Sequence, residues 1–467
     1  MNKVRVLDLF SGSGGLSIGL KNAGLQIVAG VDNDPDSSKT YSKAHPKTIT
    51  VCSDINDYFG KKKKRLKELG EIDIVVGGPP CQGFCAINPK RSISDPRNTL
   101  VDSFFQVCNL FLPKFILMEN VTGLLSLEKG VALASILKFL ESKNYKVSIK
   151  VLQASHYGVP QHRWRLFVAA SRMGTFHFPK PTHKSNSRAN FPSGKKYTFD
   201  LPVQDTLFDK YENPATVWEA ISDLPKINNG GGSDVEEYPK QTKKTLLSGY
   251  QKKIRGSCKN LFNHKTVNLK ETQMQRIRAL PKEGMNWLDL PEDLIPENLK
   301  KLREKYGTGL GCKSRFGRLC AREQFSTILT KPEMYWGTFI HPKQHRVISV
   351  REAARAQSFP DKVQFFGSLT SQYRQVGNAI PPILGEALGK AIKKHIKKYY
   401  STSESESSIS NKPILIKPLL DAFCCAAFTV FPLAVPITTP LGSSIFTVNI
   451  FLLTVPPTPS LLYVGGF

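Results

Sequence analysis

The chain has 467 residues, 40% of them hydrophobic, which is enough for two domains or for one large domain with an insertion. Its 65 lysines and arginines exceed its 38 acidic residues, so the formal net charge is +27. This excess favours a polyanionic partner, and nucleic acid is the leading candidate. A basic surface that serves only solubility is the alternative.

Cysteine usage and the N-terminus indicate the compartment. The nine cysteines include no CxxC pair, and their spacing does not form a disulfide framework, which indicates free thiols in a reducing environment. The first residues lack the long apolar core of a signal peptide. We therefore expect an intracellular protein, in the cytoplasm or nucleoid.

The first 171 residues alternate strand and helix patterns. Residues 4–9 predict a strand, and the Gly-rich turn at 11–15 leads into a helix that ends near Ala23. Further strands are predicted at 26–31, 72–76, 115–118, 146–151 and 166–170. Further helices are predicted at 35–44, 100–111 and 131–142. This alternation predicts an α/β fold with a doubly wound, mostly parallel sheet covered on both faces. Residues 1–171 are accordingly the expected cofactor-binding and catalytic domain.

The alternation ends after Ser171. Residues 172–345 are rich in Lys, Pro, Asn and Ser, which predicts a smaller, irregular second domain inserted into the chain. Helical patterns return within 346–400, at 350–357 and 382–399. Residues 401–410 are rich in Ser and Glu, which predicts a disordered linker, and an apolar tail follows. A membrane-spanning helix at 419–437 would contain Asp421, Pro432 and Pro436, so we expect 401–467 to lie outside the fold.

A glycine-rich turn joins the first strand to the first helix in DLFSGSGGL at 8–16. Glycines let a backbone approach a ligand closely, although tight packing alone is the alternative. Asp32 ends the second strand, where a carboxylate can accept both ribose hydroxyls. Asp54 follows the predicted third strand, within reach of an adenine amino group. The GxGG spacing differs from the GxGxxG of dinucleotide binders, so an adenosyl group without pyrophosphate, as in S-adenosylmethionine, fits better.

Cys81 lies in GGPPCQGF at 77–84, directly after the apolar run at 72–76. Two prolines stiffen this loop and two glycines free it, and loops on a rigid scaffold commonly carry catalytic residues. The alternative for a single cysteine is a small buried core residue. We interpret Cys81 as a nucleophile because of its loop and of an acid found downstream.

That acid is Glu119, at the end of an apolar strand. Burial there would raise its pKa and let it donate a proton, whereas a capping or loop glutamate is the alternative. In QHRWR at 161–165, alternation places Gln161, Arg163 and Arg165 on one face. Two arginines on one face can hold a carboxylate or a phosphate, and a solvated strand face is the alternative.

Together these motifs resemble the DNA (cytosine-5)-methyltransferase family, in family order from Val4 to about Ile396. The blocks that carry the resemblance are DLFSGSGG, the acid after strand two, GGPPCQGF, DPRNTL at 95–100, MENV, QHRWR, REAARAQSFP at 351–360 and QVGNAIPP at 375–382. Asp32 stands where many members have Glu, and Asn98 replaces a common glycine. The resemblance implies a Rossmann-like methyltransferase domain, a target recognition domain at 172–345, and a C-terminal helix that completes the cofactor domain.

The resemblance also implies a reaction. Cys81 as thiolate would add to position 6 of cytosine, Glu119 would bind or protonate ring N3, and Arg163 would orient Glu119 and the base. Position 5 would take the methyl group of S-adenosylmethionine, after the base has left the duplex. Arg165 and Gln161 complete the predicted catalytic set. The predicted cofactor contacts are Phe10, Gly12, Gly14, Gly15, Asp32, Asn33, Asp54, Ile55, Pro79, Asn378 and Ile380.

Double-stranded DNA is the partner that the resemblance implies. The predicted DNA contacts are Gln82 and Arg97 on the Cys81 loop and Arg318 in the recognition region. No metal ion and no obligate protein partner are expected, while a restriction endonuclease acting separately fits a stand-alone modification enzyme. A tRNA-directed relative and a catalytically inactive DNA-binding relative are the alternatives. The long insert and the residues after Cys81 favour DNA, and the intact catalytic set gives no support to loss of activity.

Overall fold

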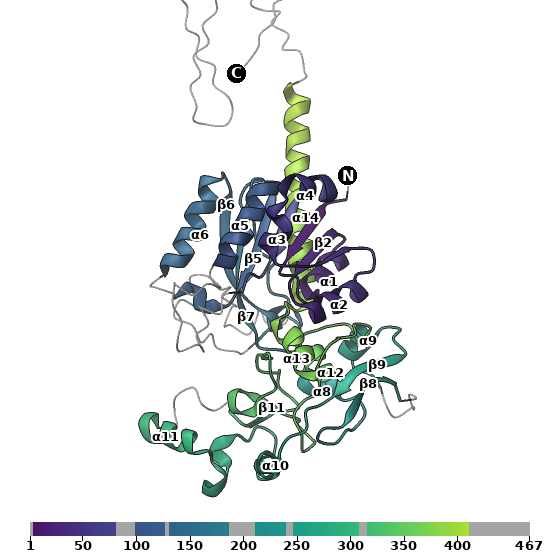
Figure 1. The fold of residues 1–467 in the computed structure, drawn as a ribbon, viewed down its shortest axis with the longest axis vertical. Helices are drawn as coiled ribbons and strands as arrows, with labels where there is room; N and C mark the ends of the chain where they lie inside the picture. Colours follow the sequence, from purple (N-terminus) through teal and green to yellow (C-terminus); the bar gives the residue numbers. More distant parts are fainter. Residues whose placement is uncertain are drawn as a thin grey trace, which may run out of the picture. The chain divides into compact units, whose positions relative to one another are not determined.

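The computed structural model describes residues 3–80, 99–126, 130–185, 211–239, 246–307 and 315–410 (Figure 1). Contacts divide the chain into two units, Met1–Ser403 and Glu404–Phe467, and the architecture below belongs to the first. None of the helices in the described residues is long and apolar enough to cross a membrane.

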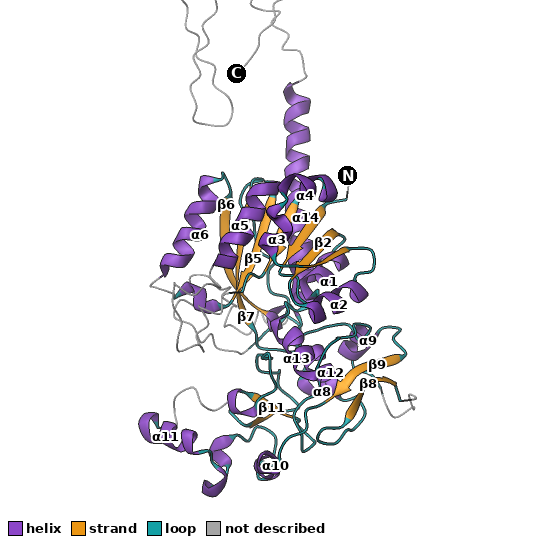
Figure 2. Cartoon of the chain, in the orientation of Figure 1, coloured by secondary structure: helices purple, strands orange, loops and turns teal. Residues whose placement is uncertain are grey.

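A seven-stranded sheet forms the centre of this unit, with strand order β3-β2-β1-β4-β5-β7-β6 (Figure 2). Neighbours from β3 to β5 pair in parallel, whereas β7 pairs antiparallel with both β5 and β6. The strands are β1 Arg5–Leu9, β2 Gln26–Asp32, β3 Ile49–Cys52, β4 Ile74–Gly77, β5 Phe115–Asn120, β6 Lys146–Gln153 and β7 Trp164–Ser171. The predicted mostly parallel α/β sheet is therefore confirmed.

Helices cover both faces of the sheet, because side chains alternate along each strand. On β4, Val75 packs into the core beneath one set of helices, while Ile74 and Val76 pack into the core on the opposite face. The first set is α3 Ile55–Gly60, α4 Lys62–Leu69, α5 Thr99–Phe111 and α6 Val131–Ser142. The opposite face holds α1 Gly15–Asn22 and α14 Pro382–Ser410. Helix α2, Pro35–Ala44, follows β2.

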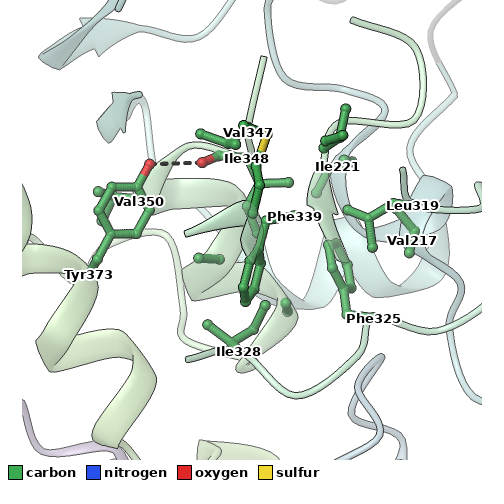
Figure 3. Packing of buried hydrophobic residues seen from close by; sticks show 14 of the residues in the cluster. Val217, Ile221, Leu319, Phe325, Ile328, Phe339, Val347, Ile348, Val350 and Tyr373 are labelled. Carbon is green, nitrogen blue, oxygen red and sulfur yellow. Dashed lines mark hydrogen bonds between the residues drawn. The ribbon is translucent and has the colours of Figure 1, made fainter. Parts of the chain in front are cut away.

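A second apolar core lies outside the sheet and gathers residues from Val217 to Val376, with Ile18 of α1 against it (Figure 3). Two short sheets belong to this region, β8 Gly232–Glu237 with β9 Asn260–Lys265 and β10 Gly317–Arg318 with β11 Thr338–Ile340. Its helices are α8 Val217–Ile221, α9 Gly249–Arg255, α10 Glu271–Arg278, α11 Glu297–Tyr306, α12 Val350–Ala356 and α13 Leu369–Asn378. Because α12 and α13 pack into this core, the return to the sheet expected from residue 346 is made by α14.

Two local predictions were wrong. Residues 401–410 continue α14 to Ser410 instead of forming a disordered linker. This stretch contains no proline or glycine, and a helix that is already nucleated extends easily through serine and glutamate. The segment before Asn378, read as a loop, is the end of α13, where Gln375 is buried and hydrogen-bonds Phe366 and Thr40.

Gly19→Ala should destabilise the fold, because α1 and α14 touch at this residue. A Cβ on Gly19 would lie 2.4 Å from both the Glu386 nitrogen and the Pro382 carbonyl oxygen, and backbone atoms cannot move aside cheaply. We expect a loss of about 1–3 kcal/mol in the free energy of unfolding, measured by urea denaturation. The control is Gly60→Ala, where a Cβ meets no atom within 4 Å of the described residues. Equal stability of the two variants would contradict this close packing.

Candidate active site

A cavity of about 550 Å³ opens at the carboxyl ends of the parallel strands. Between β1 and β4 the strand order reverses, and ligands of open α/β sheets bind at such a switch point. Its walls come from the turns after β1, β2 and β4, from the end of β5, and from the segment that follows α13. Eight predicted cofactor residues line it: Phe10, Gly12, Gly15, Asp32, Asn33, Pro79, Asn378 and Ile380.

Asp32 fixes the glycine-rich turn against the end of β2. Its Oδ2 accepts a hydrogen bond of 2.8 Å from the Gly12 N–H, and its Oδ1 accepts one of 2.9 Å from the Asp34 N–H. Burial raises the pKa of Asp32, and these two backbone donors oppose the rise. A carboxylate has about four lone-pair sites, so acceptor positions are left for a ligand's hydroxyl groups.

The turn after β1 also touches the C-terminal segment. A Cβ on Gly15 would lie 2.3 Å from the Ile380 carbonyl oxygen, so glycine is required for this approach. Gly14, Asp54 and Ile55 do not line the cavity. Gly14 packs against His45, Asp54 caps α3 through the Asn56 N–H, and Ile55 is buried beneath the sheet. Their predicted contact with a cofactor stays a prediction.

Asp8 is a cavity residue to which the sequence reading assigned no role. It is 2% exposed, and its Oδ2 accepts a hydrogen bond of 2.6 Å from the Ser17 hydroxyl, which also lies 2.9 Å from the Tyr41 hydroxyl. Burial raises the pKa of Asp8 to about 7. The available signal was an acid at the end of an apolar strand, which is the criterion that selected Glu119.

Glu119 lies on the opposite wall of the same cavity. Its Oε1 is 3.0 Å from Nε of Arg165, and both side chains are mostly buried. Burial raises the pKa of Glu119, in the direction expected at the end of an apolar strand, while Arg165 and then Arg163 oppose the rise. A carboxyl group in this setting can act as a proton donor or as a hydrogen-bond partner for a ligand.

Arg165, rather than Arg163, pairs with Glu119. The Arg163 guanidinium is 1% exposed and donates from Nη1 to the Ile328 carbonyl at 3.3 Å and from Nη2 to the Gly377 carbonyl at 2.9 Å. Its Nε has no hydrogen-bond partner among the described residues. Arg163 lines the cavity, but its orienting contacts are to these two backbone segments.

Comparison with known proteins decides the family. Residues 4–394 match the C-5 cytosine-specific DNA methylase family. This chain belongs to that family. It is 32% identical over 437 residues to the type II methyltransferase M.AgeI of Thalassovita gelatinovora, covering 82% of this chain and 98% of that protein. The resemblance predicted from the sequence motifs is thereby confirmed.

Longer relatives and solved structures agree with this assignment. The methylase is 31% identical to DNA (cytosine-5)-methyltransferase 1B of Oryza sativa subsp. japonica and to DNA (cytosine-5)-methyltransferase 1 of Mus musculus, over 83% of this chain. It spans only 28% of the length of each of these relatives. A crystal structure described as a prophage-encoded DNA modification methyltransferase from E. coli superposes with a TM-score of 0.60 at 25% identity. That match covers 85% of this chain and 100% of the other.

Two predicted site residues of this methylase have structural roles instead. Gln161 is fully buried, donates to Ala356 and Gln357, and accepts from the Ile328 N–H, so its amide holds neighbouring segments in place and is not catalytic. Arg318 is 2% exposed and donates to four backbone carbonyls, so the predicted DNA contact is wrong. Periodicity and charge do not reveal burial, which depends on segments distant in sequence.

The Cys81 loop is only partly described. Cys81, Gln82 and Arg97 lie outside the described residues, so their predicted roles stay predictions. Pro80 lines the cavity, and the Asn120 amide at the end of β5 donates to the Pro79 carbonyl at 3.3 Å. Because consecutive Cα atoms are about 3.8 Å apart, Cys81 begins beside the cavity wall that carries Glu119.

Asp8→Asn should remove a pH dependence of stability. Burial raises the folded-state pKa from 3.8 to about 7, so the folded protein keeps a proton that the unfolded chain releases in this range. The stabilisation is complete below pH 3.8 and is lost as pH rises through 7, by at most about 4 kcal/mol. In urea unfolding, wild type should lose more stability than Asp8→Asn between about pH 5 and about pH 8.

The control for this comparison is Asp57→Asn, a change at an exposed position of α3. It should follow the wild-type pH dependence. Parallel losses in wild type and Asp8→Asn would show that Asp8 is ionised alike in both states.

Proposed function

We propose that this chain transfers a methyl group from S-adenosylmethionine to carbon 5 of cytosine in a specific double-stranded DNA sequence. The observation that carries the proposal is that one cavity joins two kinds of site. One wall holds the glycine-rich turn with Asp32, and the opposite wall holds Glu119 with Arg165. Family membership and the basic charge of the chain support the choice of DNA as substrate.

The cavity fits an adenosyl cofactor. Gly12 presents an open backbone, since a Cβ there would meet no atom within 4 Å of the described residues, and Asp32 retains acceptor positions for ribose hydroxyls. Phe10, Pro79 and Ile380 offer apolar contacts for the adenine and the methionyl chain. When bound, S-adenosylmethionine supplies an electrophilic methyl group.

The residues on the opposite wall activate the base. In the proposed reaction the Cys81 thiolate forms a bond with cytosine carbon 6, and Glu119 donates a proton or a hydrogen bond to ring N3. Arg165 keeps the carboxyl group in place, while burial keeps its pKa raised. After methylation, water removes the proton from carbon 5, the carbon–sulfur bond breaks, and Cys81 is regenerated. The base must first leave the duplex, since the ring atoms are inaccessible within it.

The match to nearly the full length of a type II methyltransferase favours a modification enzyme of a restriction–modification system. We propose that any cognate endonuclease acts separately on the same DNA sequence. The tRNA-directed alternative is an outcome of the experiment that follows.

Cys81→Ser should abolish methyl transfer, because a serine hydroxyl is too weak a nucleophile for carbon 6 at neutral pH. The test is conversion-based cytosine methylation sequencing of plasmid DNA from cells that express each form of the chain. Wild type and the exposed control Cys52→Ser should methylate one short motif fully, and Cys81→Ser should leave it unmodified. Retained methylation in Cys81→Ser would refute the nucleophile. Unmodified DNA in all forms, with tRNA methylated by the purified wild type, would refute the DNA substrate.

Asp32→Ala should weaken binding of S-adenosylmethionine by about 1–3 kcal/mol, because a buried pair of hydrogen bonds is lost. Isothermal titration calorimetry measures this affinity directly. Asp57→Ala, at an exposed position of α3, is the matched control and should bind like the wild type. Unchanged affinity in Asp32→Ala would rule out the ribose contact.

A further inference from the structure

An exposed aromatic and cationic stack stands on the surface of the second core region. Trp336 is 46% exposed, although tryptophan is among the side chains most costly to leave in water. The Arg315 guanidinium lies 4.8 Å from the Trp336 ring centroid and 4.6 Å from that of Tyr335. The two rings meet edge to face, with centroids 4.9 Å apart. A flat, polarisable surface with a positive charge is thus presented to solvent.

The stack is held rigidly by the segments that carry it. The Phe316 N–H donates to the Met334 carbonyl at 2.6 Å, and the Trp287 N–H donates to the Arg315 carbonyl at 3.2 Å. Phe316 and Met334 are buried, so the two backbones are fixed to the core directly beneath Arg315 and Trp336. Order that is built in before binding lowers the entropy lost when a partner is bound.

One group in the stack lacks a polar partner. Nη1 of Arg315 is buried, yet it has no hydrogen-bond partner among the described residues. A buried donor without an acceptor is unfavourable, and an acceptor brought by a ligand would satisfy it. Phosphate oxygens and base edges are the acceptors that arginine binds most often in nucleic acids.

The stack is connected to the active cavity by a short piece of chain. Ile328 accepts the hydrogen bond from Arg163, and Thr330 lines the cavity. Trp336 follows Thr330 by six residues, which span at most about 20 Å. Ile328 and Phe339 anchor the two ends of this piece in the same core (Figure 3). The stack therefore lies within reach of nucleotides next to a base held in the cavity.

We propose that Trp336 and Arg315 form a contact surface for the nucleotides that flank the target cytosine in duplex DNA. This inference rests on the proposed function. The aromatic face stacks on a base or a sugar that is exposed where the target base leaves the duplex, and Arg315 binds a phosphate or a base edge. Base–aromatic stacking with an arginine close by is a common way to bind nucleic acid, and the chain's positive charge favours the same partner.

Trp336→Ala should raise the Kd and the KM for duplex DNA about 10-fold, with little change in kcat or in affinity for S-adenosylmethionine. Trp336→Phe, which keeps a ring, should recover most of the DNA affinity. The matched control is Trp218→Ala, because Trp218 is 41% exposed in the same region but lies in a different cavity. Binding and methyl-transfer kinetics are measured on one duplex that carries the target motif.

Tryptophan fluorescence gives a second readout, since the chain has only four tryptophans. Adding duplex DNA should quench the emission of the wild type and of Trp218→Phe, and this quench should be largely lost in Trp336→Phe. A wild type that methylates DNA beside a Trp336→Ala variant with unchanged KM and Kd overturns this inference alone. A wild type that neither binds nor methylates duplex DNA overturns the proposed function and the inference together.

Discussion

One buried guanidinium joins the two halves of the active cavity. Arg163 enters from the start of β7, donates to the Ile328 carbonyl of the second core region, and donates to the Gly377 carbonyl at the end of α13. Burial lowers the pKa of this arginine, so its charge is held at a cost that its carbonyl partners must offset. Without these contacts, neither Thr330 nor Asn378 would lie against the sheet that carries Glu119.

Further buried charges hold the second core region together. Arg355 pairs with Asp361 at 2.7 Å and with Asp223, and Arg346 pairs with Glu352 at 2.7 Å through both of its terminal nitrogens. Burial alone would raise the pKa of Glu352, but the paired Arg346 holds it well below its ordinary value. Such networks are sensitive to the loss of any member, because a charge left unpaired in the interior is far costlier than the pair. The motif at 351–360 is thus structural: it joins α12 to α8 and to the loop that follows.

The cavity combines two electrostatic environments. Asp8 and Asp32 lie on the wall built by β1 and β2, where burial raises both pKa values and backbone or hydroxyl donors oppose the rise. Glu119 lies across from them with a guanidinium at 3.0 Å. One end therefore offers acceptors to a hydroxylated ligand, and the other offers a carboxyl group poised between its charged and neutral forms. This separation is what a two-substrate transfer reaction requires of a single cavity.

The sequence by itself determined the sheet, the order of its strands and helices along the chain, the glycine-rich turn and the position of Asp32, because these follow from local periodicity and turn chemistry. It also identified the family, since the motifs occur in order. Only the tertiary structure decided that Arg165 rather than Arg163 contacts Glu119, that Gln161 and Arg318 are buried, and that Asp8 lines the cavity. These outcomes depend on carbonyls and side chains tens to hundreds of residues away, such as Gly377 for Arg163. A side chain's charge is local, but its burial and its partners are set by the whole fold.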